Sequence, residues 1–203
     1  MFIIVIVIIA TFLSFDLYYR FYKPVVATKS WPELAKRTGL AFQPPTGSWS
    51  NRSLARVTGT YRGYALKLDT PRVVPGPVDD GIAMYRTRIV LTMNQPVTGS
   101  LSLKHRWFFS RGFLRGEGQQ IGDALFDQRF IIHSRPADYA GQIFAAKTLR
   151  QRFLAEKEIR EFSLSNLGVR CEIKGILSDV KKLHDLFNLL ADVVQTVKSV
   201  EQR

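Results

Sequence analysis

The sequence predicts an α+β protein, with an N-terminal transmembrane helix followed by one soluble domain with a mainly antiparallel sheet and a long C-terminal helix packed on it. Three observations predict this class. The chain opens on an apolar run, MFIIVIVIIATFLSF. Its middle contains segments in which apolar and polar residues alternate, as in half-buried strands. Its last segment repeats apolar residues at intervals of three and four, as in an amphipathic helix.

The apolar run from Phe2 to Phe15 is short for a membrane span and suits the apolar core of a signal peptide. A signal peptide also needs a basic segment before that core and a small-residue cleavage site after it, and the sequence has neither. We therefore predict an uncleaved transmembrane anchor at 1–23, a linker at 24–30 and a soluble domain at 31–203. The interfacial end of the anchor is predicted to consist of Asp16, Tyr18, Tyr19, Arg20 and Tyr22.

Charge around the anchor predicts its orientation. Lys and Arg follow the apolar run and none precedes it, so the domain is expected on the cytoplasmic side of a bacterial inner membrane or an internal membrane. The single cysteine, Cys171, agrees with a reducing compartment because it can form no disulfide within the chain. The net charge of +12 implies a polyanionic neighbour, and an anchored domain favours anionic lipid over nucleic acid.

The first half of the domain predicts a short helix and then strands. Ser30 and Glu33 match a capping box, and Gly39 is placed to end the helix that they begin. Residues 54–69 alternate around a turn and predict a hairpin. Two further alternating segments, 82–94 and 100–105, follow closely in sequence, and we expect the strands to form an antiparallel meander.

The second half predicts another strand, two short helices, a hairpin and the long helix. The strand is expected around 130–133, and Pro136 suits the first turn of the helix after it. Residues 161–175 alternate around a turn, which predicts the hairpin and places Cys171 in the core rather than at a reactive site. Ser178 is expected to cap the C-terminal helix, and packing on the sheet is favoured over a coiled-coil partner.

Three short patterns resemble a loose group of bacterial single-pass membrane-anchored proteins of unknown function. They are W-x-x-L-A-x-R-x-G-L-x-F from Trp31 to Phe42, G-x-Y-x-G from Gly59 to Gly63, and F-D-x-R-F-x-I from Phe126 to Ile132. The resemblance covers most of the chain from Trp31 onward. It implies the same order of elements, and it implies no catalytic residue.

Candidate catalytic and metal-binding residues are few and scattered. His105, His133 and His184 lack metal-ligand spacing, so we predict no metal site. The acidic pairs Asp79 with Asp80 and Asp123 with Asp127 suit turns better than a paired-carboxylate hydrolase. The glycines at 116, 118 and 122 lack the G-x-G-x-x-G spacing, so no phosphate-binding loop or other cofactor site is predicted.

One basic and aromatic segment stands out as a candidate docking site for a membrane or a partner. It comprises Lys104, Arg106, Trp107, Phe108, Phe109, Arg111, Phe113 and Arg115. Its rings could instead continue the preceding strand into the core. As an interfacial contact, the cations would act at long range and the rings at short range, whereas stacking on single-stranded nucleic acid would use the same residue types but suits an anchored domain less.

These features favour a non-enzymatic accessory or assembly subunit. In this hypothesis the basic domain docks against anionic lipid and a larger membrane protein complex, such as an energy-transducing one. The alternative is a membrane-tethered enzyme or small-ligand-binding domain whose site is built from residues scattered in sequence. Co-purification of a stoichiometric complex would separate the two.

Overall fold

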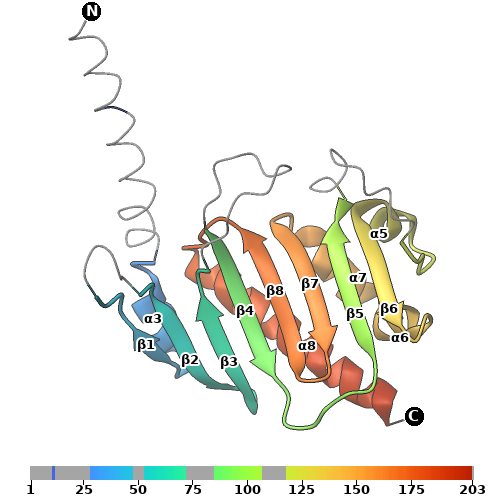
Figure 1. Ribbon diagram of the computed structural model, residues 1–203, viewed down its shortest axis with the longest axis horizontal. Helices are drawn as coiled ribbons and strands as arrows, with labels where there is room; N and C mark the ends of the chain where they lie inside the picture. Colours follow the sequence, from blue (N-terminus) through green and yellow to red (C-terminus); the bar gives the residue numbers. More distant parts are fainter. Residues whose placement is uncertain (1–10, 12–27, 48–52, 72–84, 107–117, 203) are drawn as a thin grey trace, which may run out of the picture.

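The computed structural model describes residues 11, 28–47, 53–71, 85–106 and 118–202 of the chain. They form one eight-stranded antiparallel sheet with helices against one of its faces (Figure 1). The strands are β1 (Ala41–Gln43), β2 (Arg56–Tyr61), β3 (Tyr64–Asp69), β4 (Arg86–Thr92), β5 (Ser100–His105), β6 (Phe130–Arg135), β7 (Ile159–Ser165) and β8 (Gly168–Lys174). The helices are α3 (Trp31–Thr38), α5 (Ala124–Arg129), α6 (Tyr139–Ile143), α7 (Lys147–Ala155) and α8 (Val180–Glu201).

The strands follow the order β1-β2-β3-β4-β8-β7-β5-β6 across the sheet. Both predicted hairpins are confirmed, since β2 pairs with β3 and β7 pairs with β8. The predicted meander is wrong between β4 and β5. These strands do not pair with each other, because β8 pairs with β4 and β7 pairs with β5. The C-terminal hairpin therefore lies between two strands that are neighbours in sequence.

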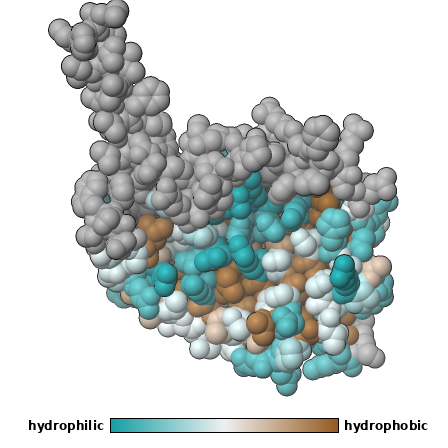
Figure 2. Space-filling model, viewed as in Figure 1, coloured by the Kyte–Doolittle hydropathy of each residue, from teal (hydrophilic) through white to brown (hydrophobic). Residues whose placement is uncertain are grey.

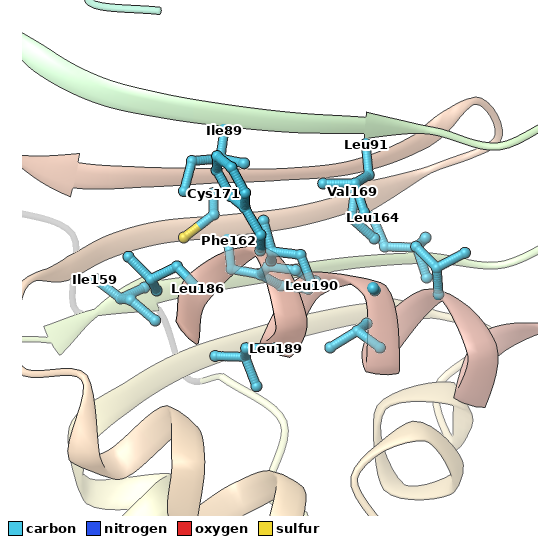
Figure 3. Packing of buried hydrophobic residues seen from close by; sticks show 14 of the residues in the cluster. Ile89, Leu91, Ile159, Phe162, Leu164, Val169, Cys171, Leu186, Leu189 and Leu190 are labelled. Carbon is cyan, nitrogen blue, oxygen red and sulfur yellow. The ribbon is translucent and has the colours of Figure 1, made fainter. Parts of the chain in front are cut away.

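The core lies between the sheet and α8. Inward side chains of the central strands, among them Ile89, Leu91 and Cys171, point toward Leu186 and Leu190 of the helix (Figure 3). All five are fully buried, and this apolar burial is the main source of stability for the two layers. The predictions that the C-terminal helix packs on the sheet and that Cys171 is a core residue are confirmed.

The starts of α3 and α8 differ from the prediction, α3 because a tertiary contact takes the hydroxyl of its expected cap and α8 because its cap lies one residue later. Gly39 ends α3 in the left-handed conformation, as predicted, with φ of 70°. Ser30, however, makes no cap of α3, because its hydroxyl donates to the carbonyl oxygen of Ser178. Asp179 caps α8 in place of Ser178, since its carboxylate accepts the backbone N–H of Lys182 at 3.0 Å. The two helix starts are thereby tied together.

The β6 edge of the sheet is partly covered by the side chain of Gln119. The backbone N–H of Gln119 donates to the carbonyl of Ile132. Its side-chain oxygen accepts from the backbone N–H and the hydroxyl of Ser134, and its amide nitrogen donates to the Ser134 carbonyl. One side chain thus satisfies strand groups that a further strand would otherwise pair with.

The transmembrane helix has to be removed from the predicted fold class. No helix within the described ranges is both long and apolar enough to cross a bilayer. The 22-residue α8 is long enough, but its apolar stripe faces the sheet and its other side is charged. Residues 1–23, with the predicted interfacial residues Asp16, Tyr18, Tyr19, Arg20 and Tyr22, lie outside the described part except for Thr11. The predicted single-pass localisation with a cytoplasmic-side domain is corrected with it, because both rested on that span.

Replacing Gly168 by Ala should strongly destabilise the protein. Gly168 begins β8 with φ of 152°, and a Cβ atom there would lie 2.1 Å from the carbonyl oxygen of Leu91 on β4. Because backbone atoms of a central strand pair cannot move aside cheaply, we expect a loss of about 3 kcal/mol or more in the free energy of unfolding. Urea denaturation of the full chain, followed by circular dichroism, measures it.

Gly141→Ala is the matched control, because a Cβ atom at Gly141 of α6 meets nothing within 4 Å. It should change the free energy of unfolding by less than about 1 kcal/mol and in the stabilising direction. Equal effects of the two substitutions would contradict the tight β4–β8 contact.

Candidate functional site

The candidate site is the face of the sheet that lies opposite the helices, which we call the open face. Alternation along each strand directs one set of side chains to the helices and the other set to this face. Figure 2, in the view of Figure 1, shows hydrophilic residues gathered over its upper half, with hydrophobic ones interspersed below them. Its basic side chains are Arg56, Lys67, Arg86, Arg88, Lys104, Arg135, Arg170 and Lys174. Its acidic side chains are Asp69, Glu161 and Glu172.

A row of charged residues crosses the open face from β3 to β5. Asp69 on β3 is paired with Arg88 on β4, and Arg88 is paired with Glu172 on β8. Glu172 is paired with Glu161 on β7, which is paired with Lys104 on β5. Opposed residues on neighbouring strands have Cβ atoms about 5 Å apart, so these groups act on one another directly.

Asp69 organises two cations at the β3 end of this row. Its carboxylate accepts two hydrogen bonds from Arg88, from Nε at 2.8 Å and from Nη2 at 2.7 Å, and lies 3.1 Å from Nζ of Lys67. The Asp69 side chain is only 8% exposed. Burial alone would raise the pKa of this carboxyl, but the hydrogen bonds and charges of Arg88 and Lys67 outweigh it, so the pKa is lowered.

Glu172 organises two further cations on β4 and β8. Arg86 donates to its carboxylate at 2.8 Å, and Arg170 donates to the other oxygen. The Glu172 side chain is slightly more buried than that of Asp69, at 5% exposed. Burial would raise its pKa, yet the hydrogen bonds from Arg170 and Arg86 prevail and the pKa is lowered. Both carboxylates are therefore ionised at neutral pH, and each is shared by two cations.

The predicted docking segment is described only at its start. Lys104 lies on the open face at the end of the charged row. Arg106 lies apart from that row, where its Nη2 donates to the carbonyl of Asp127 at 3.3 Å. The remaining predicted site residues lie outside the described residues, namely Trp107, Phe108, Phe109, Arg111, Phe113 and Arg115.

The other candidate residues, Asp123, Asp127 and Cys171, have structural roles in the fold. Asp123 caps α5, a helix that we did not predict, and also pairs with Arg150 at 2.8 Å. Asp127 accepts the backbone N–H groups of Ile121 and Gly122. Burial raises the pKa of the Cys171 thiol. Within the described ranges, no group of three or more His, Cys, Asp or Glu residues could hold a metal ion.

Alternation in the sequence places several open-face cations, among them Arg88 and Arg170, on the polar side of a strand, but it does not bring them together. Their proximity depends on the β4–β8 pairing, which joins segments about eighty residues apart and leaves no local signal. One signal of this grouping is present in the sequence, namely the excess of basic residues on the polar sides of three separate strands.

Comparisons with known proteins give a likeness of fold. No family model and no curated protein matches the sequence. Among solved structures, the crystal structure of the mycobacterial trehalose monomycolate transport factor A, TtfA, matches with a TM-score of 0.58. The match covers 84% of this chain and 94% of that chain at 10% sequence identity. At this identity it shows a shared fold and assigns no residue a role.

Acid should destabilise the protein through Asp69 and Glu172. Both carboxyls have a lower pKa in the folded state, so their stabilisation is complete above the unfolded pKa of about 4. It is lost as the pH falls through the folded pKa. Asp69→Asn should lower the free energy of unfolding by about 2 kcal/mol near neutral pH. Between about pH 5 and pH 3, the free energy of unfolding of this variant should then fall less than that of the wild type. Urea denaturation across this range measures both effects.

Glu33→Gln provides the control, because Glu33 forms an exposed pair with Arg37 on α3. It should change the free energy of unfolding near neutral pH by less than about 0.5 kcal/mol. If the free energy of unfolding of Asp69→Asn falls in parallel with that of the wild type as the pH is lowered, Asp69 and its cationic partners do not cause the loss of stability in acid.

Proposed function

We propose that this protein is a non-enzymatic accessory subunit that docks on an acidic surface of a larger protein complex through the open face of its sheet. The observation behind the proposal is the basic open face, on which Asp69 and Glu172 hold four cations in place. Charged surfaces of one sign speed the encounter with an oppositely charged partner and set its orientation. The net charge of +12 adds long-range attraction to an acidic partner.

The state of the carboxylates favours docking over acid catalysis. A general acid at neutral pH needs a raised pKa, whereas the pKa values of Asp69 and Glu172 are lowered by their cationic partners. Each of these carboxylates is also largely buried, with its oxygens occupied by hydrogen bonds from arginine side chains. On the open face they orient cations, which is the role of a support for a binding surface.

The shared fold agrees with an accessory role. The structure that matches this chain is named a transport factor for trehalose monomycolate. We carry over from that name only the general idea of a factor that assists a transport machinery, since fold alone does not determine function. The complex on which this chain docks is proposed by its chemistry, as one with an acidic surface large enough to cover the open face.

Charge reversal on the open face should abolish co-purification of the complex. Arg56 on β2 and Arg135 on β6 are exposed and lie toward opposite edges of this face. A tagged full-length chain with Arg56→Glu and Arg135→Glu should lose stoichiometric partners that the wild type retains. The loss follows because like charges across an interface cost several kcal/mol. Affinity purification with quantitative mass spectrometry measures it.

The control reverses two exposed lysines on the helix side, Lys36 on α3 and Lys181 on α8. Lys36→Glu with Lys181→Glu makes the same change in net charge and should leave co-purification intact. If both double variants lose the partner equally, net charge rather than the open face drives association. If the open-face variant keeps the partner, the proposal is wrong.

A further inference from the structure

We propose that the open face contains a binding site for a phosphate group, formed by Lys67, Arg88 and Arg170 around Val90. The site rests on the proposed function only in using the same face of the sheet. Its ligand chemistry is a phosphate with close to two negative charges, either free in solution or carried by a lipid headgroup.

The sheet register places these residues together. Val90 on β4 is paired with Lys67 on β3 and with Arg170 on β8, so the two cations flank it in one row. Arg88 precedes Val90 by two residues and therefore points to the same face. With strands about 4.8 Å apart, three long cationic side chains surround one short, half-buried apolar side chain.

Each of the three cations is held by a carboxylate that points it onto the face. Asp69 binds Lys67 and takes the Nε and Nη2 groups of Arg88, so this pair leaves the Nη1 group of Arg88 unused. Glu172 binds Arg170 through Nη2. The side chains of Lys67 and Arg170 are 44% and 50% exposed and can reach a ligand from solvent. Donors oriented in advance lose less entropy when they bind an anion.

The charge balance fits a doubly charged anion. Together with Arg86, the cluster has four cations and two carboxylates, so two positive charges are not compensated within it. A phosphate monoester has a charge of about −1.5 to −2 near neutral pH. Guanidinium groups also present paired N–H donors that match the spacing of phosphate oxygens.

The test titrates the full-length protein with inorganic phosphate near neutral pH, with chloride keeping the ionic strength constant, and measures binding by isothermal titration calorimetry. The wild type should bind phosphate saturably. Lys67→Gln with Arg170→Gln should weaken binding by about tenfold or more, since it removes two charge-assisted donors. This variant keeps the Arg88–Asp69 and Arg86–Glu172 pairs, so circular dichroism should show an intact fold.

Two further variants make the result decisive. Lys36→Gln with Lys181→Gln removes the same charge from the helix side and should leave phosphate affinity unchanged. Arg88→Lys keeps the charge beside Asp69 but removes the Nη1 group, and should also weaken phosphate binding. It tests the site independently if the double variant fails to fold. Absence of saturable binding to the wild type, or equal affinity in the open-face and helix-side variants, would overturn the site.

Vesicles separate the two sources of phosphate. If a headgroup supplies it, the wild type should bind vesicles of phosphatidylcholine with phosphatidic acid but not phosphatidylcholine alone, and inorganic phosphate should compete. Saturable phosphate binding without vesicle binding assigns the site to free phosphate. Vesicle binding that resists phosphate and persists in the Lys67→Gln, Arg170→Gln variant contradicts the site. A wild type that binds no phosphate but still co-purifies with the complex overturns this inference alone, whereas the Arg56 and Arg135 reversals bear on the proposed function.

Discussion

The pairing of β4 with β8 is the contact on which the rest of the fold depends. It joins the N-terminal strands β1 to β4 to the group formed by β8, β7, β5 and β6, and it is the sole pairing that links these two groups in the described sheet. The inner sides of both strands supply fully buried residues to the core under α8. Their outer sides bring Arg86 and Arg88 beside Glu172 and Arg170. One register therefore sets both the core and the charged surface.

The two faces of the sheet bury different kinds of side chain. The inner face buries apolar side chains, which need no partners of defined direction. The open face buries two carboxylates, and a buried charge is tolerated only when it is paired and hydrogen-bonded. Each carboxylate has two cationic partners. The pairing that stabilises these two carboxylates therefore also leaves a net positive charge on the open face.

Local patterns predicted most strands but not their arrangement. Alternation located β2, β3, β4, β5 and the β7–β8 hairpin, because one side of each strand is apolar. The β4–β8 neighbourhood was missed because sequence proximity favoured a β4–β5 pair, and a pairing between distant segments leaves no periodic signal. The cap of α8 lies one residue later than predicted, at Asp179, whose carboxylate accepts the backbone N–H of Lys182.

The candidate site was predictable only as a list of polar strand positions. Alternation placed Lys67, Arg88 and Arg170 on solvent-facing sides, but their grouping around Val90 requires the register of three strands. The docking segment predicted from the sequence, 104–115, was selected because it is rich in cations and aromatic residues. Composition reports which residues are present along the chain and not which of them share a surface.

The partly covered β6 edge affects how a partner could approach the sheet. Gln119 occupies strand groups near Ser134, and at the opposite edge β1 has three residues and is followed by two prolines, which lack the N–H that a continuing strand needs. Extension of the sheet by a strand from another molecule is thus disfavoured at both ends. A partner that docks as proposed would therefore meet the sheet through side chains of the open face rather than through backbone pairing at an edge.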